Sequence, residues 1–159
     1  MNQIVPVVAA CKTEKMALPG GFAFLLHKKN EAEDEEHVPR NPELVGKWEF
    51  SGGMVKYGED PEAALRREIR EELNREIIIG RLIHARTNIY KDGVHYLVLF
   101  YHCKFPEHLP PIDGCKWFSY SDIVCLDGDL AALPGTLEVV KLCIEHCRAW
   151  GERAIHQNT

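Results

Sequence analysis

Three glutamates in one short run of charged residues are the side chains of this sequence best suited to chemistry. Glu68, Glu71 and Glu72 occupy positions i, i+3 and i+4. On an α-helix with Glu68 placed at 0°, Glu72 falls at about 40° and Glu71 at about −60°, so the three carboxylates share one face. Carboxylate oxygens are hard ligands, so the spacing predicts a site for Mg²⁺, with Mn²⁺ as an alternative, where substrate phosphates complete the coordination.

The same run has a purely structural interpretation. A helix face that mixes Arg and Glu is commonly a solvated surface held by salt bridges, and Arg67 and Glu71 form a favourable i, i+4 pair. Neighbouring carboxylates at these spacings cost an isolated helix about 0.2 to 0.5 kcal/mol per pair, and a divalent cation would reverse that cost. The run alone does not decide between the two interpretations, so a longer pattern is needed.

That longer pattern begins at Gly53, which is followed after five residues by Glu59 and after seven more by residues 67–72, R-E-I-R-E-E. It resembles the signature of the Nudix hydrolases, G-x5-E-x7-R-E-U-x-E-E-x-G-U, in which U is aliphatic. By average amino-acid usage, chance would produce the matched positions at about one start in ten million. Two positions of this box, residues 53–75, depart from the signature: Asn74 replaces Gly, and Arg75 replaces an aliphatic residue.

The flanking sequence resembles the MutT-like branch of that family. Residues 47–53 read K-W-E-F-S-G-G, similar to a W-E-F-P-G-G approach with Ser51 in place of Pro, and Trp117-Phe118 resembles a later strand. The resemblance implies an α/β fold, an α/β/α sandwich around a mixed β-sheet. It also implies Mg²⁺-dependent hydrolysis of a (deoxy)nucleoside triphosphate to monophosphate and pyrophosphate. The alternatives are a pyrophosphatase for ADP-ribose or another linked nucleoside diphosphate, and a non-catalytic nucleotide-sensing module.

The resemblance also assigns roles to individual residues. The positions implied to bind the metal are the Gly52 carbonyl and the carboxylates of Glu68, Glu71 and Glu72. Arg67 and Glu59 match a pair that orients the catalytic helix. The implied reaction is in-line attack of a metal-activated water on a phosphorus of the pyrophosphate bridge. The proton acceptor varies within the family, and Glu71 and Glu107 are the candidates here.

Fewer residues point to the substrate. Lys28 occupies the region in which MutT-like enzymes keep basic residues near the phosphates. Trp48 or Phe50 could stack on a base, and alternation along an extended segment predicts that only one of them faces the pocket. Leu137 stands where enzymes specific for oxidised guanine typically carry Asn before a Glu, which argues against 8-oxo-guanine as the preferred base.

The elements that must position these side chains follow from hydrophobic periodicity and turn residues. Asp60 is a predicted N-cap and Pro61 a predicted first helical residue, and Asn74 is predicted to end that helix in a left-handed conformation. The acidic segment Asn30–Pro42 is predicted to be an exposed loop, and it has no assigned role. The predicted strands cover 4–11, 22–27, 47–50, 76–79, 82–84, 88–90, 95–103 and 116–119, and the predicted helices 61–73, 120–124 and 137–150.

The composition bounds the class of protein. A chain of 159 residues with 45% hydrophobic and 27% charged residues predicts one globular domain over residues 1–159. A net charge of −5 argues against a nucleic-acid-binding protein, and no apolar run reaches the roughly 18 residues of a membrane helix. We therefore expect a cytoplasmic monomer or homodimer whose partner is a small nucleotide.

The six cysteines are expected to be reduced and mostly buried. No Cys-x-x-Cys pair occurs in the sequence, although Cys143 and Cys147 flank His146, and His102 precedes Cys103. Structural zinc sites usually include such a close pair, so a zinc site is disfavoured. Cys143 and Cys147 are instead assigned to the apolar stripe of the C-terminal helix.

Overall fold

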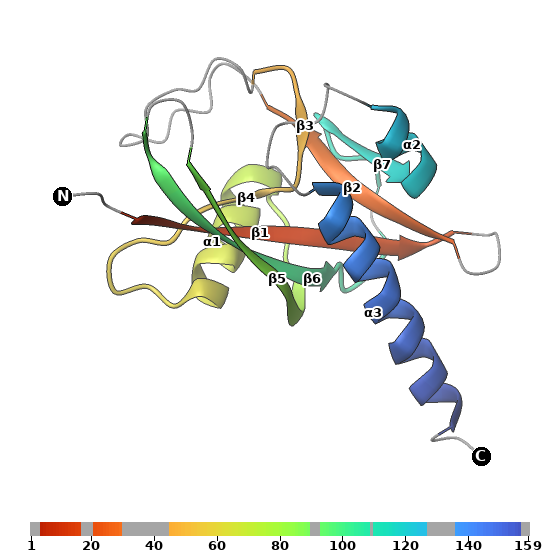
Figure 1. The fold of residues 1–159 in the computed structure, drawn as a ribbon. Coiled ribbons are helices and arrows are strands. Elements are labelled where there is room, and N and C mark those ends of the chain that lie inside the picture. The colour runs from red at the N-terminus through yellow and green to blue at the C-terminus, as the bar shows by residue number, and fades with distance from the viewer. Residues whose placement is uncertain are drawn as a thin grey trace.

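Seven strands and three helices make up the residues that the computed structural model describes, which are 4–16, 21–29, 45–89, 93–108, 110–126 and 136–156. The predicted acidic loop at 30–42 lies outside these ranges. Figure 1 shows the arrangement. The strands are β1 (Ile4–Lys15), β2 (Phe22–Lys28), β3 (Trp48–Glu49), β4 (Gly52–Met54), β5 (Ile78–Ile89), β6 (His95–Lys104) and β7 (Cys115–Ser119), and the helices are α1 (Pro61–Leu73), α2 (Tyr120–Cys125) and α3 (Thr136–His156).

Strand β1 is the centre of the sheet. Its residues 4–12 pair in parallel with residues 95–103 of β6, and its residues 7–9 pair antiparallel with β4. Its last residues, 13–15, pair antiparallel with β2, so these two strands form a hairpin. The strand order is β3-β2-β1-β6-β5, with β4 paired to β1 and β7 paired to β2. The sheet is therefore mixed, as expected.

The two faces of β1 bury different layers, because successive side chains of a strand point in opposite directions. Val8 and Ala10 pack in one hydrophobic cluster with Leu65 and Ile69 of α1. Ala9 and Cys11 pack in a second cluster with Val139, Val140 and Cys143 of α3. Helices α1 and α3 thus cover opposite faces of the sheet (Figure 1), which makes an α/β/α sandwich.

Two parts of the sheet differ from the prediction. The segments predicted as three short strands between residues 76 and 90 form one strand, β5, whose register against β6 shifts between Ile79 and Leu82 and again between Leu82 and His84. Gly80 lies at the first of these register shifts, and the strand continues through the glycine. Strand β4 was not predicted because its two glycines indicate a turn. Its backbone instead packs directly on that of β1.

Helix α1 begins and ends where the sequence predicts. The Asp60 side chain accepts a hydrogen bond from the Glu62 N–H at 2.9 Å, and Pro61 is the first helical residue. At the other end, Asn74 has φ 51° and ψ 46°, and its N–H donates to the Arg70 carbonyl. The caps therefore fix the length of the helix that carries the three glutamates.

Substitution of Asn74 tests this helix end. We expect Asn74→Gly to keep the parent's stability, because Gly adopts positive φ without steric cost. We expect Asn74→Val to lower the free energy of unfolding by about 1 to 2 kcal/mol, because a β-branched residue is strongly disfavoured there. Urea unfolding of both variants and the parent measures the difference. A Val variant as stable as the parent would contradict the left-handed helix end.

Helix α3 begins one residue before the predicted start and continues past Trp150 to His156. Its buried side includes Val139, Val140 and Cys143. No helix in the described ranges has a stretch both long and apolar enough to cross a membrane.

Candidate functional site

The three glutamates of α1 lie at different depths. Glu68 is only 5% exposed, whereas Glu71 and Glu72 are on the open side of the helix. Arg67 contacts the Glu68 carboxylate and donates to Glu71 Oε2 at 3.2 Å. The three carboxylates therefore line one helix face, as the spacing predicts, with two of them held by the same guanidinium.

The donor set suits a hard divalent cation. The helix offers only carboxylate oxygens on this face, which are ligands that Mg²⁺ prefers. In the described ranges, the three glutamates are not among the groups whose ligand atoms all lie within 4.8 Å of one another. Mg²⁺ usually takes one or two carboxylates and keeps several waters, so it does not require the three oxygens to converge. The residues thus fit Mg²⁺ chemically.

Arg67 ties α1 to the loop and strand that precede it. Its Nε donates to Glu59 Oε1 at 2.8 Å, and its Nη2 donates to Glu59 Oε2 and to the Met54 carbonyl, both at 2.9 Å. Glu59 also accepts the Lys56 N–H at 3.0 Å. The hydrogen bond from Arg67 lowers the pKa of Glu59 to about 2. The hydrogen bond to Glu59 in turn raises the pKa of Arg67. The predicted pair is thus in bidentate contact, next to β4.

Lys12 is a buried cation beneath the acidic face, and it was not among the residues predicted from the sequence. It is fully buried, and its Nζ has no hydrogen-bond partner among the residues that the structure describes. Burial lowers its pKa from 10.5 to about 8, an effect that the nearby Glu72 partly opposes. The predicted strand ended at Cys11, so Lys12 was not assigned to the sheet. The signal was present, because Val8, Ala10 and Lys12 alternate on the face that α1 covers.

Replacing Lys12 with Met tests the cost of this burial. The pKa of Lys12 in the folded protein lies below its ordinary value, so the unfolded chain binds more protons between pH 8 and 10.5. The free energy of unfolding of the parent therefore rises with pH in that window. We expect Lys12→Met to be more stable than the parent by about 1 to 3 kcal/mol at pH 7, and by less at pH 10.

Urea unfolding with EDTA and a reductant, at pH 7 and at pH 10, measures this difference. Lys141→Met, at an exposed position on α3, is the control and should be neutral. A Lys12→Met variant no more stable than the parent at pH 7 would refute the cost of the buried charge.

Two of the predicted substrate contacts lie together near β3. Lys28 is exposed, and its Nζ lies 5.9 Å from the centroid of the Trp48 ring. Trp48 is half-buried and packs edge-on against Phe118. Phe50, by contrast, is 3% exposed and contacts Phe100, so it is a core residue and not a stacking surface. Of the two aromatic residues, Trp48 is therefore the remaining candidate for stacking on a base.

The remaining candidates are separate from the glutamates. Leu137 is 37% exposed at the start of α3, where the adjacent Glu138 accepts a hydrogen bond from Arg86 at 3.1 Å. Glu107 is exposed and lines a cavity of about 680 Å³ together with Phe105, among others. None of the three α1 glutamates lines that cavity. Glu107 therefore lines a cavity that the three glutamates do not share, whereas Glu71 lies on the acidic face itself.

Comparison with known proteins identifies the family of this chain. The family model described as NUDIX domain matches residues 12–137. The chain is 38% identical over 100 residues to nucleoside triphosphatase NudI of Escherichia coli (strain SE11) and of Shigella flexneri, and this alignment covers 54% of the chain and 71% of each relative.

Solved structures show the same fold. A NUDIX hydrolase from Nitrosomonas europaea matches with a TM-score of 0.68 and 18% identity over 88% of both chains. The E. coli ORF135 protein matches with a TM-score of 0.62 and 23% identity over 92% of this chain and 93% of that one. The box, the helix that carries it and the matched family model agree: the chain belongs to the Nudix family and is a hydrolase that acts on phosphoric anhydride bonds.

Proposed function

We propose that this protein is a Mg²⁺-dependent nucleotide pyrophosphohydrolase that cleaves a (deoxy)nucleoside triphosphate to the monophosphate and pyrophosphate. The observation that carries the proposal is the acidic face of α1, where Glu68, Glu71 and Glu72 lie beside the Arg67–Glu59 pair. Similarity to proteins named nucleoside triphosphatase supports the choice of substrate class.

In this proposal the Gly52 carbonyl and the carboxylates of Glu68, Glu71 and Glu72 would hold Mg²⁺, some of them through the waters that the ion keeps. Mg²⁺, when bound, neutralises phosphate charge and polarises the reacting water. Arg67 keeps the helix in place against β4 through Glu59 and the Met54 carbonyl. The water oxygen adds to a phosphorus of the α–β bridge, the bridging P–O bond breaks, and pyrophosphate leaves. Glu71, which is exposed next to Glu68 and Glu72, accepts the water proton.

The same proposal assigns the substrate contacts. Lys28 meets the phosphates, and the half-buried ring of Trp48 stacks on the base. Leu137 offers no amide to the hydrogen-bonding edge of a purine. Apolar pockets separate similar ligands by only about 10- to 200-fold, so base preference should be relaxed.

A matched set of kcat/KM values tests this specificity. We expect 8-oxo-dGTP to exceed the best of dGTP, dCTP, dTTP and dATP by no more than about 10³, because shape and stacking alone discriminate weakly. ADP-ribose is the sixth substrate of the set. A preference of about 10⁴ or more for 8-oxo-dGTP would mean that another group, such as the buried Thr136 or a backbone amide, reads the base.

Product analysis separates the proposal from its alternatives. A nucleoside triphosphatase of this type releases monophosphate and pyrophosphate, whereas cleavage of ADP-ribose gives AMP and ribose 5-phosphate. A nucleotide-sensing module would bind nucleotide saturably and release neither product. All three glutamates are retained, which favours an enzyme over the module.

A further inference from the structure

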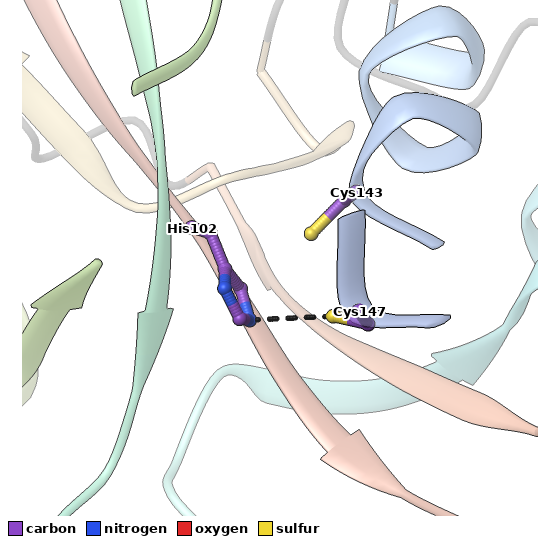
Figure 2. Close-up of side chains that lie close together, drawn as sticks. All are labelled: His102, Cys143 and Cys147. Atoms are coloured by element: carbon purple, nitrogen blue, oxygen red, sulfur yellow. Dashed lines mark hydrogen bonds between the residues drawn. The ribbon is translucent and has the colours of Figure 1, made fainter. Parts of the chain in front are cut away.

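A second group of potential metal ligands lies between β6 and α3, on the face of the sheet opposite α1. His102 comes from β6, and Cys143 and Cys147 come from successive turns of α3. The ligand atoms of the three side chains all lie within 4.8 Å of one another, and His102 Nε2 is 3.5 Å from Cys147 Sγ. Figure 2 shows the imidazole and both sulfur atoms facing the same space. It is the one set of three that meets this distance limit within the described residues.

We propose that His102, Cys143 and Cys147 form a binding site for Zn²⁺. Thiolate and neutral imidazole are the ligands that Zn²⁺ favours in proteins. Tetrahedral coordination, with Zn–S at about 2.3 Å and Zn–N at about 2.0 to 2.1 Å, places ligand atoms about 3.6 to 3.8 Å apart. The observed separations need a change of about 1 Å or less, within the range of side-chain rotation.

Ordinary core packing does not account for the whole cluster. A cysteine on the buried face of a helix is a common small apolar residue, which explains Cys143 alone. His102, however, is a polar side chain only 7% exposed, and its Nε2 faces both the Thr13 hydroxyl, at 2.8 Å, and the Cys147 thiol. A further sulfur belongs to the same hydrophobic cluster as Cys143, that of the fully buried Cys11 of β1.

An ion can reach this group from solvent. The cavity of about 680 Å³ that Glu107 lines is also lined by Thr13, His102, His146 and Cys147. Cys147 is half-buried, so one side of the group is open to the cavity, while Cys143 is fully buried on the other side. Water in the cavity would complete a tetrahedron around three protein ligands.

The proposed ion would join two elements that are distant in sequence. His102 is fixed in the sheet by the pairing of β6 with β1, and the two cysteines belong to the helix that covers that face. Binding to the folded protein alone would stabilise it and hold α3 on the sheet. This role is independent of the acidic face of α1, which presents oxygen ligands only.

Cobalt substitution tests the site directly. The full chain is reduced, stripped of metal with a chelator and titrated with Co²⁺. We expect thiolate-to-cobalt charge-transfer absorption and tetrahedral d–d bands that saturate at one ion per chain, and we expect Zn²⁺ to abolish them. Co²⁺ at the carboxylates of α1 gives no thiolate band, so the measurement distinguishes the two sites. A parent protein without the thiolate band would overturn the proposal.

Two cysteine variants complete the test. Cys147→Ser, at a half-buried position, should lower Zn²⁺ affinity by at least about a hundredfold in competition with a chromophoric chelator and remove the charge-transfer band. Cys125→Ser is the matched control, because Cys125 is exposed at the end of α2 and outside the cluster. Its affinity should equal that of the parent. Parental affinity in Cys147→Ser, or an equal loss in Cys125→Ser, would refute the assigned ligands.

Discussion

Replacing Glu72 or Glu71 with Gln is expected to lower turnover by at least about a hundredfold. Each substitution removes one negative charge from the proposed metal-binding face, and charge stabilisation at comparable sites contributes about 10² to 10³ in kcat. Both side chains are on the open side of α1, where Glu71 accepts a hydrogen bond from Arg67 and Glu72 attracts the buried Lys12. The variants should still fold as the parent does, because reduced repulsion between neighbouring carboxylates offsets the loss of these attractions.

The measurement is kcat with a nucleoside triphosphate at saturating Mg²⁺, together with urea unfolding. Glu62→Gln is the control: Glu62 is an exposed residue in the first turn of the same helix, and its loss should leave turnover near the parental value. Parental turnover in either the Glu71 or the Glu72 variant would remove that residue from the site.

Gly52→Ala is expected to cause the largest loss of stability. A Cβ at this position would lie 2.0 Å from the Val8 carbonyl oxygen and 2.8 Å from the Ala9 Cα. Both are backbone atoms of the central strand, so no side chain can rotate out of the way. Strand β4 would have to separate from β1, and the Met54 carbonyl that Arg67 holds would move with it. We expect a loss of at least about 4 kcal/mol in the free energy of unfolding.

Gly58→Ala provides a matched comparison. Gly58 has φ +75°, with open space where a Cβ would lie, so it should cost only about 1 to 2 kcal/mol of backbone strain. Urea unfolding of both variants, with the yield of folded protein from equal cultures, measures the difference. If Gly52→Ala were as stable as Gly58→Ala, the close approach of β4 to β1 would be wrong.

Local signals predicted the acidic helix well. Asp60, Pro61 and Asn74 act within one turn of the helix ends, so their effect can be read from neighbouring residues alone. The spacing of Glu68, Glu71 and Glu72 likewise needs only the period of the helix. The contact between Arg67 and Glu59 was available only through resemblance to a family, because the loop between them has no regular period.

Features that depend on distant parts of the chain were missed. In the sequence, the charged Lys12 looks like the end of the apolar strand before it. Only its pairing with Cys103 of β6 places it inside the sheet. The cluster in which we propose a zinc site is a similar case. The argument from the missing Cys-x-x-Cys pair concerns local spacing, whereas His102 reaches Cys143 and Cys147 through the packing of α3 on β6. Phe50 was a candidate for stacking until the core cluster showed it to be buried.

The alternation of β1 lets one strand support both helical layers. Cys11 and Lys12 are consecutive residues, yet one faces the layer of α3 and the other the layer of α1. Neither helix can detach without exposing apolar side chains of a strand whose other face still supports its partner. Partial detachment of either helix therefore also affects the strand on which the other helix packs. Lys12, beneath the acidic face, and Cys11, in the layer of the cysteines of α3, are joined by a single peptide unit.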